Sequence, residues 1–128
     1  MTRFLIVAAG GALGAVARYG LGRLLPMTGG WPWPTLTANV AGGLLMGLLT
    51  GWLAFRGGAQ GETIRLFAAV GVLGGFTTFS AFSLETVLMI ERRQFAMASS
   101  YVAVSVAASV IALFLGLMLA RRAFGAAI

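Results

Sequence analysis

Four long windows of apolar residues alternate along this chain with short polar or turn-forming joints. The windows are Phe4–Leu25, Thr35–Phe55, Ile64–Ile90 and Phe95–Ala120. A transmembrane helix needs about 20 predominantly apolar residues, so each window is long enough to cross a bilayer. The pattern therefore predicts an all-α membrane protein with four transmembrane helices.

The joints between the windows are Pro26–Pro34, Arg56–Thr63 and Glu91–Gln94. None of them has room for a soluble domain, so we expect residues 1–128 to form a single four-helix transmembrane domain. The first window also begins as a secretory leader does, with Arg3 ahead of an apolar run. Because the apolar stretch continues to Leu25 and is rich in glycine, we expect it to be a membrane span.

The composition agrees with a membrane setting. Hydrophobic residues make up 59% of the chain and charged residues 9%, whereas about 25% of the residues of a soluble domain are charged. The chain has no histidine and no cysteine and only three acidic residues. Acid–base, nucleophilic and metal chemistry therefore have few side chains to use, and we expect that the protein is not an enzyme.

The net charge of +6 is carried by arginine, because the chain has no lysine. The arginines lie at predicted helix ends and in joints, where they would meet phospholipid headgroups, so we expect no nucleic-acid partner. With four spans, one side of the membrane would hold Arg3, Arg56, Arg65, Arg121 and Arg122, and the other side Arg23, Arg92 and Arg93, together with Arg18 if its side chain reaches that way. This near balance scarcely selects an orientation. Either copies insert both ways round, which is dual topology, or the slight excess sets one orientation.

Glycines recur four residues apart in the predicted helices, as in Gly10–Gly14, Gly43–Gly47–Gly51 and Gly71–Gly75. This spacing lets helix backbones approach closely in lipid. Four helices of this length leave little room for a lined pathway, so a transport protein of this size is expected to be an oligomer. Dual topology would supply an antiparallel homodimer.

The most unusual polar segment, Gly74–Ser83, lies inside the third window. Its glycines favour a break near the middle of the third helix, and Thr77, Thr78 and Ser80 can bond to the freed backbone groups. Broken helices recur where ions bind, because free carbonyls coordinate cations and free N–H groups hold anions.

Aromatic rings alternate with these hydroxyls. Phe76, Phe79 and Phe82 recur every third residue, which predicts that they share one side of the helix. The positive edge of a phenyl ring can face an anion. Glu85, the one acid of the central windows, is expected either to pair with an arginine or to lie near the membrane interface.

Polar residues of the other helices complete the inventory. Arg18 is either a structural anchor or a fixed positive charge at the mouth of a pathway. Asn39 either joins helices or faces a solute, since a helix cannot satisfy its amide. Tyr101, Ser105 and Ser109 are spaced i, i+4 and i+8, so they form either one polar track or separate back-bonded residues. Amide and hydroxyl donors with an arginine and few carboxylates favour an anion as the solute.

Three segments, Gly10–Tyr19, Thr35–Asn39 and Gly74–Phe82, closely resemble the Fluc/CrcB family of fluoride channels, and the resemblance covers essentially the whole chain. It implies a dual-topology antiparallel homodimer of four-helix subunits with two fluoride pores near the dimer interface. It also implies a passive channel that exports toxic fluoride across the cell (inner or plasma) membrane down its gradient.

The resemblance further implies roles for single residues. Phe79 and Phe82 would contact fluoride with their ring edges. Asn39 would be the pore amide, Thr78 and Ser80 would be pore hydroxyls, and Arg18 would lie in the vestibule. The polar track would be Tyr101, Ser105 and Ser109. The backbone carbonyls of Gly74 and Thr77 would hold a structural sodium ion at the dimer centre. Ala81 departs from the family pattern, which often has threonine there, so a hydroxyl contact at that position is not expected.

Two alternatives come from other functional classes. Small proton-coupled multidrug exporters are also short four-helix proteins, but they depend on a glutamate in the first helix, and this first window has no acid. An accessory subunit that packs against a larger transporter is the other alternative.

Overall fold

The computed structural model describes residues 1–125, and all regular structure in this part of the chain is helical. Helix α1 covers Thr2–Leu24, α2 covers Trp33–Arg56, and α6 covers Phe95–Ala120, which continues as a short π-helix over Arg121–Gly125. The third long segment, Gly58–Glu91, is built from several pieces. All four segments are long and apolar enough to span a membrane, which confirms the prediction of four membrane-spanning helices. The final residues of the predicted domain, 126–128, lie outside the described residues.

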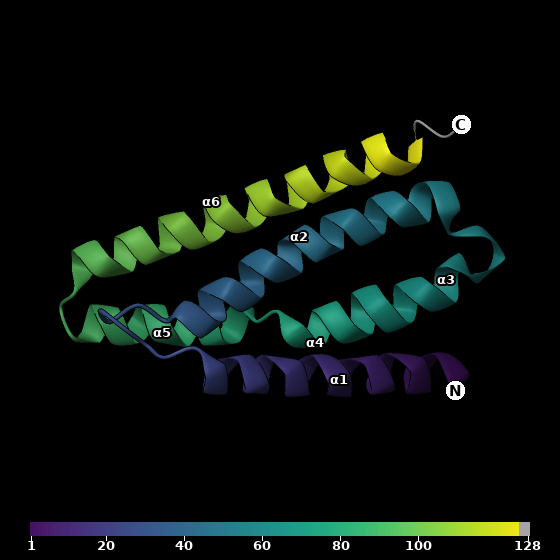
Figure 1. Ribbon diagram of the computed structural model, residues 1–128. Helices are drawn as coiled ribbons and strands as arrows, with labels where there is room; N and C mark the ends of the chain where they lie inside the picture. Colours follow the sequence, from purple (N-terminus) through teal and green to yellow (C-terminus); the bar gives the residue numbers. More distant parts are fainter. Residues whose placement is uncertain (126–128) are drawn as a thin grey trace.

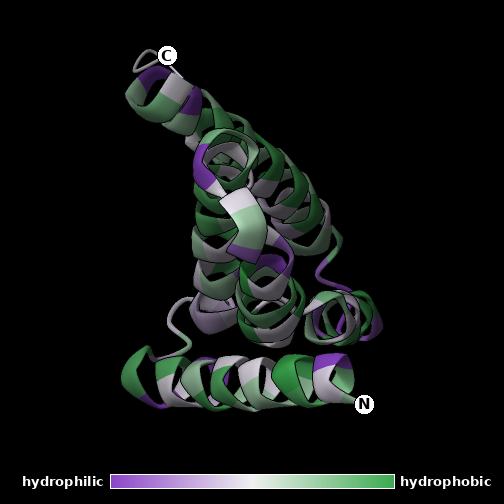
Figure 2. Cartoon of the chain, turned by 90° about the vertical axis from the view of Figure 1, so that its right-hand side faces the viewer, coloured by the Kyte–Doolittle hydropathy of each residue, from purple (hydrophilic) through white to green (hydrophobic). Residues whose placement is uncertain are grey.

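The four segments run back and forth, so that the N-terminus and the end of α6 lie at the same end of the molecule (Figure 1). The α2–α3 connection lies at that end too, and the other two connections lie at the opposite end. Eight of the arginines are therefore divided between the two ends as the four-span reading requires, whereas Arg18 lies beside the interruption of the third segment. Seen from the right-hand side in Figure 2, α1 crosses the other helices at one edge of the bundle.

The third segment is interrupted by two extended residues. It begins with a 3-10 turn at Gly58–Gln60, α3 at Gly61–Ile64, a π-helix at Arg65–Leu73 and α4 at Gly74–Phe76. Thr77 (φ −80°, ψ 154°) and Thr78 (φ −149°, ψ 118°) then leave the helical conformation. Helix α5, Phe79–Glu91, resumes the path to the far end. The predicted break in the third helix is thus confirmed.

Glycines bring neighbouring helix backbones into direct contact. A Cβ atom added to Gly14 of α1 would lie 2.0 Å from the carbonyl oxygen of Val72 in the third segment. One added to Gly47 of α2 would lie 2.1 Å from the carbonyl oxygen of Leu113 in α6. Real Cβ contacts essentially never fall below 3.0 Å, so any side chain at these positions would push the helices apart. The small-residue spacing therefore sets how closely the four segments pack.

The buried core is small and lies toward the end with the α5–α6 turn. It contains Leu36, Phe82, Met89, Ala98 and Tyr101, from α2, α5 and α6. Many large apolar side chains elsewhere are exposed, and hydrophobic residues dominate the long helices in Figure 2. Exposure on this scale fits a chain whose outer surface faces lipid or another copy.

Candidate functional site

A groove of about 430 Å³ lies beside the helix break, where α2, the start of α5 and α6 meet. Seven of the predicted site residues line it: Asn39, Thr77, Thr78, Phe79, Phe82, Ser105 and Ser109. The remaining predicted site residues, Arg18, Gly74, Ser80 and Tyr101, do not line it. The other lining groups are glycines and apolar side chains, mostly from α2 and α6. Residues spread over three helices thus come together at one place.

The side chain of Asn39 makes two hydrogen bonds to the backbone at the break. Its Nδ2 donates to the carbonyl oxygen of Thr78 at 3.0 Å, and the backbone N–H of Thr78 donates to its Oδ1 at 2.8 Å. In a continuous helix that N–H would bond to the carbonyl oxygen of Gly74, so Asn39 takes over a helical bond and releases this carbonyl. The structure therefore assigns Asn39 to the joining of α2 and the third segment. It also places the amide on the wall of the groove.

Hydroxyl groups bond to other backbone groups beside the break. Thr77 Oγ1 donates to the carbonyl oxygen of Leu73 at 2.9 Å, and Thr78 Oγ1 accepts the N–H of Ala81 at 3.1 Å as the N-cap of α5. Ser80 Oγ lies 3.2 Å from Thr78 Oγ1 and bonds to that hydroxyl instead of the backbone. The predicted role is confirmed for Thr78. The Leu73 carbonyl that Thr77 Oγ1 contacts also accepts the Thr77 N–H, so the break does not free it. The cap fixes the direction in which α5 leaves the break.

The two phenylalanines of α5 form one wall of the groove. Their ring centroids lie 5.6 Å apart with the ring planes tilted by 46°, and Phe79 is 78% exposed whereas Phe82 is buried. Phe76 does not line the groove. The prediction that it shares a helix face with the other two is wrong, because the extended residues Thr77 and Thr78 interrupt the helical period between them.

The serines of α6 face the groove from the other side. Ser105 is only 5% exposed, and its Oγ, which lies near the Tyr101 hydroxyl, makes no hydrogen bond of good geometry among the residues that the structure describes. A buried hydroxyl without a partner is rare and costs about 1–3 kcal/mol. Ser109 lines the groove one turn further along. Two members of the predicted track therefore share the groove, and one of them presents an unpaired donor.

The third member of that track, Tyr101, has another neighbour. It is fully buried, and its hydroxyl donates to Glu85 Oε2 at 3.3 Å. Thr35 Oγ1 donates to Glu85 Oε1 at 2.5 Å. Glu85 therefore links α2, α5 and α6 through hydroxyls, and pairing with an arginine is not observed among the described residues. Our sequence reasoning missed Thr35, although its place four residues before Asn39 put it on the same face of α2.

Arg18 lies on the α1 side of the break. Its Nε donates to the carbonyl oxygen of Gly75 at 3.3 Å. In a continuous helix this carbonyl would accept the backbone N–H of Phe79, which here belongs to the helix that begins after the break. The arginine thus bonds to a backbone group next to the break, which agrees with its interpretation as an anchor.

The carbonyls of Gly74 and Thr77 have the chemistry that suits sodium. The N–H that would bond to Gly74 in a helix is engaged by Asn39, and Thr77 is extended. Unwound carbonyls of this kind coordinate sodium in membrane proteins. Two carbonyls fill only part of a coordination shell, so the remaining ligands would have to come from elsewhere. Within residues 1–125, no group of three or more acidic, histidine or cysteine side chains offers another metal site.

Comparisons with known proteins agree with this architecture. Residues 5–117 match the family described as CrcB-like protein, Camphor Resistance (CrcB). A protein of Caulobacter sp. (strain K31) named "Fluoride-specific ion channel FluC" is 60% identical over 126 residues, covering 97% of this chain and 98% of that protein. Proteins of the same name from Phenylobacterium zucineum (strain HLK1) and Hyphomonas neptunium (strain ATCC 15444) are 61% and 53% identical, each over 97% of this chain and 99% of their own length.

Proposed function

Because this chain belongs to the CrcB family, we propose that it is a fluoride-selective channel through which fluoride leaves the cell passively, down its gradient. Its relatives are named fluoride-specific ion channels and match nearly its whole length. The observation that carries the proposal is the groove beside the break, in which the buried hydroxyl of Ser105 lacks a protein partner. An anion would accept the O–H of this hydroxyl, whereas a cation could be met only by the lone pairs of its oxygen.

The groove contains groups that could replace the water molecules a fluoride ion loses when it enters. Near the break these are the edges of Phe79 and Phe82 and the amide of Asn39, with the hydroxyls of Thr78 and Ser80 close by. Further along α6 they are the hydroxyls of Ser105 and Ser109, with Tyr101 beyond them at the Glu85 end. Consecutive serines four residues apart lie about 6 Å apart along the helix axis. We propose that fluoride moves between such donor groups in short steps, with no covalent chemistry and no energy input.

A second copy would close this pathway. Phe79 is 78% exposed, and Val106 and Val110 on the α6 side of the groove are also exposed. Facing lipid, an open groove would leave the ion without cover on one side. We propose an antiparallel homodimer with dual topology, supported by the small excess of arginines at one end of the molecule, five against three, with Arg18 beside the break. Each subunit would then contribute one groove in a multi-pass protein of the inner or plasma membrane.

A structural sodium ion at the centre of this dimer is the last part of the proposal. The carbonyls of Gly74 and Thr77 would hold it, and the same two carbonyls of the second copy would complete the coordination that one chain begins. Its positive charge would offset the partial negative charge of carbonyls that have lost their helical donors. Arg18, bonded to the neighbouring Gly75 carbonyl, would keep its fixed charge in the vestibule.

The test is ion efflux from liposomes that contain the purified protein. Rapid fluoride efflux with little chloride efflux is expected. Replacing both Phe79 and Phe82 with alanine should abolish the fluoride flux, whereas replacing the exposed Leu13, which is not part of the groove, with alanine should leave it intact. Equal flux of the two anions would overturn the selectivity, and fluoride flux that survives the double replacement would overturn the placement of the pore. No flux at all from the pure protein would favour an accessory subunit.

A further inference from the structure

Two cavities adjoin each other at the end of the molecule formed by the α5–α6 turn, away from the proposed fluoride groove. One, of about 470 Å³, lies over the turn and is lined in part by Trp31, Arg93 and Gln94. The other, of about 450 Å³, lies between α5 and α6 and is lined mostly by apolar groups, among them Ile90 and Val102. Phe95 lines both, so the cavity with Arg93 and Gln94, termed the polar cavity, and the apolar cavity meet at this side chain.

The turn that carries Arg93 has an unusual conformation. The N–H of Arg93 donates to the carbonyl oxygen of Ile90, and that of Gln94 donates to the carbonyl oxygen of Met89, both at 2.9 Å. This is the Schellman pattern, whose left-handed position is usually occupied by glycine. Arg93 occupies it with φ 59°, and it is the one non-glycine residue with positive φ within the described chain. Strain of this kind tends to persist where the side chain has a task.

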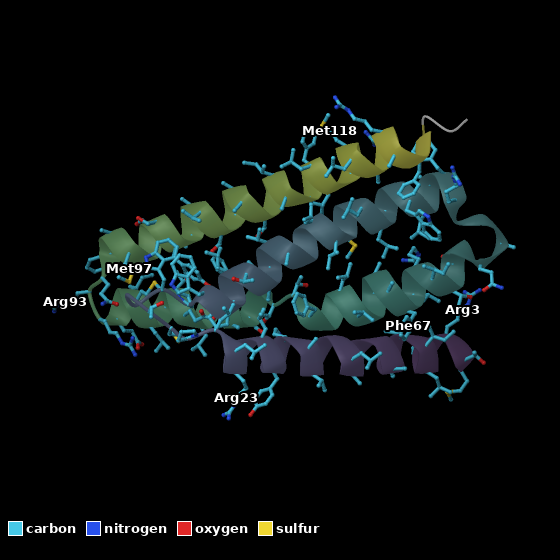
Figure 3. The ribbon with its side chains drawn as sticks, viewed as in Figure 1. Arg3, Arg23, Phe67, Arg93, Met97 and Met118 are labelled. Carbon is cyan, nitrogen blue, oxygen red and sulfur yellow. The ribbon has the colours of Figure 1, made fainter. Side chains whose placement is uncertain are left out.

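The surroundings of Arg93 indicate what that task is. Its side chain extends outward past the end of the helices (Figure 3), and no salt bridge to it is found among the described residues. Trp31 stacks on Trp33 with ring centroids 5.7 Å apart. Tryptophans gather at the headgroup level of a bilayer, so the polar cavity lies where lipid phosphates are found. The apolar cavity then lies on the acyl-chain side of the interface.

We propose that this pair of cavities binds an anionic phospholipid. The guanidinium of Arg93 would hold the headgroup phosphate, and the exposed side chain of the neighbouring Arg92 would add positive charge. One acyl chain would lie past Phe95 into the cavity between α5 and α6. Thr86 does not oppose an apolar occupant, because its hydroxyl is already donated to the carbonyl oxygen of Phe82 at 2.8 Å. The site is separate from the fluoride groove and does not depend on it.

Native mass spectrometry of the full-length protein in detergent tests this proposal, with phosphatidylglycerol, phosphatidylcholine or inorganic phosphate added. Phosphatidylglycerol should stay bound to the wild-type protein. The Arg93→Gly variant should bind it about fivefold more weakly, the loss expected for one arginine near a phospholipid surface. Its thermal stability should not fall, because glycine relieves the strained φ. Arg23→Gln, which removes a charge from the last turn of α1, is the matched control and should bind as the wild type does.

A second variant tests the proposed position of the acyl chain independently of charge. Ala103 lines the apolar cavity and is exposed, so Ala103→Phe should fill the cavity without disturbing the core and should also lower retention of phosphatidylglycerol. Fluoride flux should be unchanged in both variants. Retention of phosphatidylglycerol by Arg93→Gly at the wild-type level would overturn the proposal. Equal retention of phosphatidylcholine would overturn it as well. So would binding of inorganic phosphate as strong as that of phosphatidylglycerol.

Discussion

Replacing Asn39 with alanine removes both hydrogen bonds that join α2 to the helix break. The donor and the acceptor on Thr78, at 3.0 and 2.8 Å from the Asn39 amide, then lose their partners. Leaving one buried polar group unsatisfied costs about 1–3 kcal/mol. Two such groups together give about 2–6 kcal/mol, and water reaching the half-buried site from the groove would bring the value toward the lower end.

The loss should also change the direction of α5. Thr78 is the N-cap of that helix, so a loosened Thr78 lets Phe79 and Phe82 leave their positions beside the groove. We therefore expect Asn39→Ala to lower the free energy of unfolding and the fluoride flux together. Asn39→Asp keeps the acceptor for the Thr78 N–H but sets a carboxylate oxygen against the Thr78 carbonyl oxygen, so it should be at least as destabilising as Asn39→Ala.

The measurements are chemical unfolding in detergent and fluoride efflux from liposomes, made on the same preparations. Thr37→Ala is the control, because Thr37 lies on the same helix, is also half-buried and does not line the groove. A variant Asn39→Ala that is as stable as the wild type but conducts no fluoride would refute this reasoning. The amide would then act only on the ion.

Three further predictions follow from the packing and the groove. Gly47→Ala should destabilise the protein by about 1–3 kcal/mol or more in chemical unfolding, because its Cβ would lie 2.1 Å from the Leu113 carbonyl oxygen. Gly22→Ala is the control. It has nothing within 4 Å of its Cβ, so it should be neutral or stabilising. Ser105→Ala should slow fluoride efflux and leave stability unchanged or higher, since it removes an unpaired buried hydroxyl; a large loss of stability would mean that the hydroxyl is bonded within the protein. Exchanging sodium for a bulky organic cation should lower the thermal stability of the assembled protein, and identical melting curves in both salts would contradict the sodium site.

Much of the fold could be predicted from the sequence because membrane constraints are local. A span must be apolar over about 20 residues, and a break at membrane depth needs nearby hydroxyls, as Thr78 shows. The start of α2 at Trp33 was predicted two residues late, since Pro34 was assigned to the joint. Proline is tolerated in the first helical turn, where its missing N–H is not needed.

The errors at the site arise where helical spacing in the sequence does not tell which side chains meet in space. Steps of four residues turn a helix by about 40° beyond a full circle, so Tyr101 and Ser109 point in directions about 80° apart. Tyr101 therefore lies inside the protein against Glu85 while Ser109 lines the groove. Phe76 was assigned to a face that the break abolishes. The partner of Asn39 depends on how α2 meets the third segment, which no short pattern encodes.

The contact of backbone with backbone at Gly14 and Gly47 also shapes how this gene can vary. Every codon for glycine begins with two guanines, and a single-base change in those two positions gives either a stop codon or a residue with a side chain. At these sites the smallest addition, a methyl group, already meets a carbonyl oxygen of the facing helix. No single substitution at these glycines is therefore small enough to fit the present packing. The spacing between these helices can change only if the facing helix changes with it.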